Sequence, residues 1–237
     1  ATALTSITTG LAPGSHGVVG YCMAVRRQIL NVLRWSTPRG DARENIVPTE
    51  IQPNEAFGSE RPPVITRAEF IASGLTEAHL QPVRFEGYRM PSTMVVEIEH
   101  ALKRGEPFLY AYYDGIDKVA HEYGLGDHYD AELMAVDQMV RAIAAQLPRG
   151  AALVVTADHG QVDVGDNTIS PARDVMKLVD LQSGEGRFRW LHAKAGATAE
   201  LAAACEERYG DVAWVVTRAQ TIDEGWWGPE LVDRAAA

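Results

Sequence analysis

Residues 151–160 read Ala-Ala-Leu-Val-Val-Thr-Ala-Asp-His-Gly, a short apolar run that leads directly into two polar side chains, Asp158 and His159. A short and nearly continuous apolar run is typical of a parallel strand that is covered on both faces. Residues 108–113 form a second such run, and the amphipathic pattern of residues 129–147 predicts a long helix between the two strands. Strand, helix and strand in this order predict a βαβ unit, and therefore the α/β fold class.

The flanking segments carry weaker patterns that predict further elements on both sides of this unit. We expect helices at residues 1–9 (closed by Gly10), 93–104 and 197–209, and strands at residues 187–192 and 212–217. Residues 36–63 are rich in Pro, Asn, Glu and Arg and show little periodicity. This composition predicts irregular surface structure beside a binding cleft.

Size and composition indicate a globular chain of one domain that does not bind nucleic acid through its phosphates. The 237 residues are 46% hydrophobic, which is enough to bury a sizeable core. The formal net charge of -10 excludes binding that relies on neutralising phosphates with clustered Lys and Arg, so we expect no nucleic acid duplex as a partner. The composition gives no indication of an oligomeric state.

The cysteine content and the hydropathy of the chain indicate its cellular compartment. Cys22 and Cys205 are far apart and lie in no Cys-x-x-Cys setting, so we expect neither a disulfide framework nor a thiolate metal site. No apolar run reaches the roughly 20 residues that span a bilayer, and the first residues show no signal-peptide pattern. We therefore expect a cytoplasmic protein without a membrane partner.

Polar side chains of metal-ligand type follow both predicted strands. Asp117 and His121 are four residues apart, so on a helix they lie on one face and could share a cation, while Asp158 and His159 are adjacent. Ligands of open α/β sheets lie outside the carboxyl ends of the strands, and neighbouring strands are about 5 Å apart, which suits two metal ions roughly 4 Å apart. We expect the four side chains to converge there.

The ligand types favour particular ions, and each pair also has a simpler interpretation. Carboxylate and imidazole ligands without Cys favour two divalent ions of zinc, with manganese or iron as alternatives. Asp117 and His121 alone could be a solvated helix pair, and Asp158 alone could cap the segment that follows it. Two such pairs at consecutive strand ends favour the metal interpretation.

Three sequence blocks carry a family resemblance. They are Thr-Gly-Leu-Ala-Pro-Gly-Ser-His-Gly at residues 9–17, Asp117 and His121 before Gly124, and Thr-Ala-Asp-His-Gly at residues 156–160. In this order they resemble the type I phosphodiesterase/nucleotide pyrophosphatase family of the alkaline phosphatase superfamily. The resemblance implies a three-layer α/β/α fold with a mostly parallel central sheet, formed by residues 1–237 as a single catalytic-type domain. It also implies hydrolysis of a small phosphoester or nucleotide through a covalent phospho- or nucleotidyl-enzyme.

The resemblance further implies roles for individual residues. Asp117 and His121 would bind one metal ion together with a later His, and Asp158 and His159 would bind the second together with an early Asp and the nucleophile. Register with the family places the nucleophilic Thr or Ser immediately before Ala1, the early Asp before it, and the late His after Ala237. We therefore expect four of the six metal ligands, and no catalytic nucleophile, within residues 1–237.

Several alternatives stay open. Thr2 and Thr5 could replace the nucleophile, but register places both inside the first helix, where packing is the simpler role, and Ala3 stands where the family has an Asn. The same ligands would also support a phosphomonoesterase or a phosphonate hydrolase, and a chain without a nucleophile could be a non-catalytic binding module. A sulfatase is disfavoured because the chain has no Cys-x-Pro-x-Arg or Ser-x-Pro-x-Arg segment.

Other His and Trp residues have structural interpretations. We expect His16 to be a turn residue or to orient a ligand, and His192 to be packed in a strand or at a cleft rim. The paired Trp226 and Trp227 are more typical of a core or a cleft wall than of a platform for stacking bases.

Overall fold

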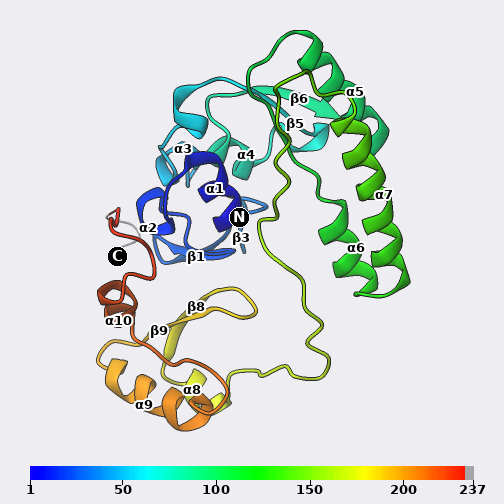
Figure 1. The fold of residues 1–237 in the computed structure, drawn as a ribbon. Helices are drawn as coiled ribbons and strands as arrows, with labels where there is room; N and C mark the ends of the chain where they lie inside the picture. The colour runs from blue at the N-terminus through cyan, green and yellow to red at the C-terminus, as the bar shows by residue number, and fades with distance from the viewer. Residues whose placement is uncertain (233–237) are drawn as a thin grey trace. The chain divides into compact units, whose positions relative to one another are not determined.

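The computed structural model describes residues 1–232, which form two compact units (Figure 1). Unit 1 combines residues 1–54 with the chain from residue 168 onward, and unit 2 consists of residues 55–167. The secondary structure is mixed α/β, as the sequence predicts. The single catalytic-type domain stays a prediction, and the two units are considered one at a time.

Unit 1 contains a six-stranded sheet in which every neighbouring pair is antiparallel. The strand order is β4-β3-β2-β1-β8-β9. The strands are β1 (Cys22–Val25), β2 (Gln28–Asn31), β3 (Ser36–Thr37), β4 (Gly40–Asp41), β8 (Val179–Gly184) and β9 (Arg189–Ala193). The strand expected at residues 187–192 is confirmed as β9.

The turn between β1 and β2 explains why these two strands are antiparallel. Only Arg26 and Arg27 separate the two strands, and Val25 pairs directly with Gln28. Both arginines have positive φ, 50° and 61°, as a two-residue hairpin turn of the primed type requires. A link of two residues cannot make the crossover that parallel strands need, so the hairpin geometry determines the strand direction.

The helices of unit 1 pack mainly through short apolar clusters. They are α1 (Thr2–Thr9), α2 (Pro13–His16), α3 (Pro48–Ile51), α8 (Arg173–Met176), α9 (Thr198–Tyr209) and α10 (Arg218–Asp223). Helix α1 ends at Gly10, whose φ of 70° is the left-handed conformation expected of a helix-terminating glycine. Val175, Val179, Leu201 and Cys205 form a cluster that joins α8 and α9 to β8. The helices expected at residues 1–9 and 197–209 are confirmed.

Two expectations for this part of the chain are wrong. Residues 36–63 are not wholly irregular surface, because they contain β3, β4 and α3 and are anchored by buried Ile46, whose carbonyl accepts a hydrogen bond of 2.6 Å from Trp35 Nε1. Residues 212–217 form no strand: Val212 and Trp214 are 64% and 90% exposed, while Val215 packs against the cluster between α8, α9 and β8. Val and Trp favour strands only where a neighbouring surface buries them.

Unit 2 contains a three-stranded parallel sheet with the order β6-β5-β7. The strands are β5 (Pro63–Arg67), β6 (Arg84–Tyr88) and β7 (Tyr110–Ala111), and the helices are η1 (Ala56–Ser59), η2 (Ala68–Phe70), α4 (Gly74–His79), α5 (Pro91–Lys103), α6 (Gly115–Tyr123) and α7 (Asp127–Ala144). Helices α5 and α7 lie side by side, and α5 packs on β5 and β6 (Figure 1). These two helices confirm the expectations for residues 93–104 and 129–147.

A cluster of buried side chains joins the sheet to α5 and α7. It consists of Ile65 from β5, Tyr88 from β6, Met94, Ile98 and Ala101 from α5, and Ile143 from α7. Met94, Ile98 and Ala101 repeat at intervals of four and three residues, so all three lie on the buried face of α5.

The predicted strand at residues 151–156 is not formed in the described structure, and the mostly parallel central sheet is not confirmed. Residues 151–157 make no ladder to another strand, and Val154 and Val155 are 83% and 66% exposed. The strand expected at residues 108–113 is β7, which forms only over Tyr110 and Ala111 and pairs with β5. An apolar run becomes a strand only when a partner accepts its backbone hydrogen bonds, so the expected βαβ unit lacks its second strand.

Two histidines are buried as neutral side chains, one in each unit. His16 Nδ1 accepts a hydrogen bond from the Val18 N–H (3.1 Å), so Nε2 carries the proton and donates to Ser6 Oγ (2.9 Å). His79 Nδ1 donates to the Leu75 carbonyl. Burial lowers the pKa of each histidine from the usual 6.5 to about 4. His16 is thus a packed turn residue, while sequence reasoning did not single out His79.

Replacing Ile98 with Ala should destabilise the protein by about 2–5 kcal/mol, because the substitution leaves a cavity in the core of unit 2. Val96 lies on the same helix but is 42% exposed, so Val96→Ala is the matched control and should change stability by no more than about 0.5 kcal/mol. Urea unfolding followed by circular dichroism measures both. Equal effects of the two substitutions would contradict this assignment of the core.

Stability should fall as the pH is lowered from about 6.5 toward 4.5. The lowered pKa of His16 and His79, and of His192, means that the unfolded chain binds protons in this range while the folded chain does not. The contribution of these histidines to the free energy of unfolding is therefore complete above pH 6.5, and it is lost as acid protonates them in the unfolded chain. Thermal midpoints across this range measure the slope, which should become smaller in His16→Gln, whereas the exposed control His100→Gln should keep it.

Candidate functional site

The first candidate pair stands on α6, which begins just after the carboxyl end of β7. The chain leaves the sheet after Tyr112, whose N–H donates to the Ile65 carbonyl (2.9 Å). Asp117 lies in the first turn of α6 and His121 one turn later, with Asp117 Oδ1 3.5 Å from His121 Nε2. The pair therefore occupies the carboxyl edge of the parallel sheet, where the sequence predicts it.

An ion pair holds the start of α6 at the end of β5. Arg67, the last residue of β5, lies 3.4 Å from a carboxylate oxygen of Asp114, the residue that precedes α6. Burial opposes the charge of Arg67, but the charge and hydrogen bond of Asp114 outweigh it and raise the pKa of Arg67. This ion pair thus links the residue before α6 to the last residue of β5.

The second pair lies in the irregular segment that follows residue 157, and it contacts the first pair. His159 Nε2 is 3.7 Å from Asp158 Oδ2 and 3.9 Å from Asp117 Oδ1. Gln161 Nε2 donates a hydrogen bond of 2.6 Å to the same Asp117 oxygen. The structure therefore brings the two predicted pairs together around Asp117, even though the predicted strand before Asp158 is absent.

The hydrogen bond of His159 places a proton on Nδ1. Nδ1 lies 3.1 Å from the Gly160 carbonyl oxygen, which can only accept, so Nδ1 is the donor. Nε2 lies on the side of Asp117 and Asp158. In the neutral tautomer with its proton on Nδ1, Nε2 is the ring atom that would bind a metal ion.

Two tyrosines form a buried environment next to Asp158. Burial is the main cause that raises the pKa of Tyr110 to about 12, and the charge of Asp158 adds to it. Tyr112 has its pKa raised by the same two causes in the same order. Both phenols stay neutral at ordinary pH, so they add no charge beside the carboxylate.

The spacing within each pair fits two ligands of one zinc ion. Bonds of about 2.0–2.2 Å in a tetrahedral site place two ligand atoms roughly 3.3–3.6 Å apart. The Asp117 to His121 distance of 3.5 Å lies in this range, and the Asp158 to His159 distance of 3.7 Å is just outside it. Within residues 1–232, no group of three or more His, Cys, Asp or Glu side chains is placed to hold an ion. The described residues therefore offer two ligands per ion, and the role of these four as ligands stays a prediction.

The other residues considered from the sequence have local roles in unit 1. Thr5 is buried and its hydroxyl donates to the Ala1 carbonyl (3.1 Å), which fits helix packing. Thr2 is half-buried at the first position of α1. His192 is half-buried on β9, with Nε2 2.9 Å from Ser183 Oγ. Gln161 was missed by sequence reasoning, because an uncharged amide two residues after His159 has no distinctive pattern.

Comparison with known proteins identifies the family. A family model described as Type I phosphodiesterase / nucleotide pyrophosphatase matches residues 1–224. The chain belongs to this family. The type I phosphodiesterase family is a hydrolase family of the alkaline phosphatase superfamily, and the described fold of this chain is mixed α/β. No curated protein matches the chain.

Membrane spans were also sought in the part of the chain that the structure describes. None of its helices has the length and apolar character needed to cross a bilayer.

Replacing Gln161 with Glu should loosen the segment that carries Asp158 and His159. The substitution turns a hydrogen bond of 2.6 Å into a contact between two carboxylates, which repel each other near pH 7. Because the Asp117 side chain is 43% exposed, the effect should be modest, with amide exchange in residues 157–162 up to about fivefold faster.

The measurement is hydrogen–deuterium exchange followed by mass spectrometry, with a chelator present so that no ion bridges the carboxylates. Gln138→Glu is the matched control, because it adds the same charge at an exposed position of unit 2. Unchanged exchange in Gln161→Glu, or an equal change in the control, would count against the Gln161 contact.

Proposed function

We propose that this member of the type I phosphodiesterase family is a metal-dependent phosphoester hydrolase in which Asp117, His121, Asp158 and His159 bind two divalent ions. The observation that carries the proposal is the position of Asp117 Oδ1, which lies within 4 Å of both imidazoles. Side chains from segments 44 residues apart in the chain thus share one small region of unit 2. Zinc is the favoured ion, with manganese or iron as alternatives.

The residues of this chain would prepare the site in three ways. Gln161 holds the Asp117 carboxylate, so that its orientation is set before an ion arrives. The Gly160 carbonyl accepts a hydrogen bond from His159 Nδ1, so Nε2 is the atom that would bind an ion. His121 is 75% exposed, which leaves the site open to an incoming phosphoester. When bound, divalent ions would supply positive charge that activates a hydroxyl or water and neutralises phosphate oxygens.

The proposed substrate is a small phosphoester or nucleotide, cleaved through a covalent phospho- or nucleotidyl-enzyme. The net charge of -10 disfavours a nucleic acid duplex. The resemblance assigns the attack on phosphorus to a Thr or Ser nucleophile. The role proposed for the four ligands is to hold the ions that would orient and neutralise the phosphate.

Two other functions fit the same residues. A phosphomonoesterase or phosphonate hydrolase would use the same ligands with different cleft walls. A non-catalytic binding module would keep the fold without a nucleophile. The stoichiometry and affinity of bound metal separate the module from the enzymes, because two ligands per ion bind weakly, whereas a complete site holds two ions tightly.

The test is zinc binding, measured by calorimetry and by native mass spectrometry. Removing one ligand, as in Asp117→Asn or His121→Gln, should weaken zinc binding at least about tenfold. His128→Gln and Asp130→Asn are the matched controls, because both change exposed side chains of the neighbouring helix α7 and should leave binding unchanged.

Hydrolysis of bis(p-nitrophenyl) phosphate and of p-nitrophenyl phosphate by the same zinc-loaded samples separates diesterase from monoesterase activity. Preference for the diester, lost in Asp117→Asn, supports the proposal, and preference for the monoester supports the phosphomonoesterase. Zinc binding without hydrolysis of either ester fits the binding module, and it also fits an enzyme whose nucleophile is not among the residues assayed. Zinc affinity that is equal in Asp117→Asn and in the unsubstituted chain would overturn the proposed ligand set.

A further inference from the structure

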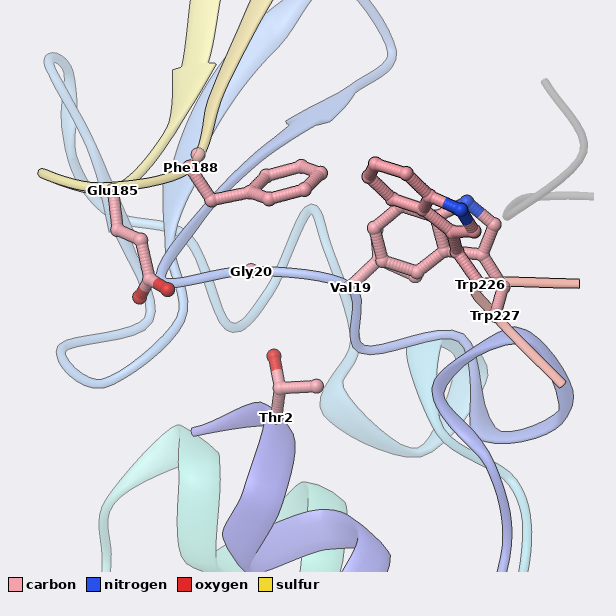
Figure 2. Close-up of a pocket in the computed structure, with 8 residues that line it drawn as sticks. Thr2, Val19, Gly20, Glu185, Phe188, Trp226 and Trp227 are labelled. Atoms are coloured by element: carbon pink, nitrogen blue, oxygen red, sulfur yellow. The ribbon is translucent and has the colours of Figure 1, made fainter. Parts of the chain in front are cut away.

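Unit 1 contains a cavity of about 230 Å³ that takes no part in the proposed metal site. It is lined by Thr2, Val19, Gly20, Gly184, Glu185, Phe188, Trp226 and Trp227. Figure 2 shows the Phe188 ring directed toward the two tryptophans, with Glu185 and the tryptophans at opposite ends of the view. Ligand pockets that enclose whole drug-sized molecules measure about 300–1,000 Å³, so this cavity suits a small group.

The two tryptophans present ring surfaces to the cavity rather than hydrogen-bond donors. Trp227 Nε1 donates to Thr221 Oγ1 (2.9 Å), and Trp226 Nε1 donates to Glu224 (2.8 Å). An indole has no other hydrogen-bonding group, so both side chains are fully committed elsewhere. What remains for a ligand is the aromatic ring itself, with its negative face.

A cluster of aromatic rings keeps this wall in place. The Trp227 ring stacks on Trp190 with centroids 5.3 Å apart, and Phe188 meets Trp227 edge to face at 5.6 Å. Such pairs restrict ring rotation and stabilise each other. The wall is therefore formed before any ligand binds.

The hairpin turn after β8 places both Glu185 and Phe188 at the cavity, and Gly184 is required for it. Gly184 has a φ of 94°, and a Cβ on it would come within 2.2 Å of the Phe188 carbonyl oxygen. The Glu185 N–H donates to that same carbonyl (2.7 Å), which closes the turn. A residue with a side chain at position 184 would open the turn and separate the carboxylate from the ring.

The charge of the lining favours a cation. The eight lining residues include one carboxylate, Glu185, and no Lys, Arg or His. Aromatic faces attract ammonium groups, and Trp is the strongest of the aromatic side chains in this respect. The amino end of α1 at Thr2 carries a partial positive charge, which disfavours a cation there and places it on the aromatic side of the cavity.

We propose that this cavity binds the ammonium head of a small organic cation against the aromatic wall that Phe188 and Trp227 form, with the Glu185 carboxylate supplying negative charge at the other end of the cavity. None of the four proposed metal ligands lines this cavity, and all its lining residues belong to unit 1. The base of a nucleotide could also stack on these rings, but the Glu185 carboxylate would repel the phosphate of that nucleotide. The ammonium head is thus the group that both the rings and the charge accept.

The test compares choline with dimethylbutanol, its uncharged carbon isostere, by calorimetry on the full chain. Choline should bind saturably in the millimolar range or more tightly, about tenfold better than the isostere. Glu185→Gln should weaken choline binding by about threefold to tenfold and leave the isostere unchanged. Glu185 is exposed, so this substitution should not disturb folding.

Glu207→Gln is the matched control, because it removes the same charge from an exposed position of unit 1 and should not change binding. Phe188→Leu should weaken choline more than the isostere. Equal affinities for choline and the isostere, equal effects of Glu185→Gln and Glu207→Gln, or tighter binding of adenosine monophosphate than of choline would each overturn the proposal. Metal chelation should not affect choline binding, so this test and the zinc test can fail independently.

Discussion

One carboxylate oxygen, Asp117 Oδ1, holds the candidate site of unit 2 together. It accepts a hydrogen bond from Gln161 and lies within 4 Å of His121 and His159. Residues 151–157 make no strand ladder, so the sheet backbone does not position the segment that follows them. Side-chain contacts with α6 do so instead. Such contacts are weaker than a ladder, because partly exposed polar pairs contribute about 1 kcal/mol or less each.

The helices could be predicted from sequence, whereas much of the sheet structure could not. Helices α5 and α7 follow from apolar spacing within their own residues, and that spacing also identifies the face that is buried. The β1–β2 hairpin depends on Arg26 and Arg27 adopting positive φ without the Asn-Gly pair that usually announces such a turn. The run at residues 151–156 has the composition of a strand, but pairing depends on a partner that lies elsewhere in the chain.

The candidate site shows the same division between local and distant information. Asp117, His121, Asp158 and His159 could be selected because carboxylates and imidazoles directly after apolar runs are chemically distinctive. Gln161 could not, because an amide gains its role only from the 2.6 Å contact that the fold creates. The hydrogen bond from His159 Nδ1 to a backbone carbonyl also required coordinates. Sequence thus selected the candidate ligands, and structure identified the groups that contact them.

The chain is acidic, and in both units the carboxylates of the proposed sites favour cations. Asp117 and Asp158 add negative charge at the candidate metal site, so a phosphoester can approach them only if cations compensate that charge. In the cavity of unit 1 the proposed cation is part of the ligand itself, and it is attracted by the aromatic rings and by Glu185. Metal ions are strongly hydrated and need carboxylate and imidazole ligands, whereas an ammonium head is weakly hydrated and needs ring surface. The two sites therefore call for chemically different cations, and neither site could replace the other.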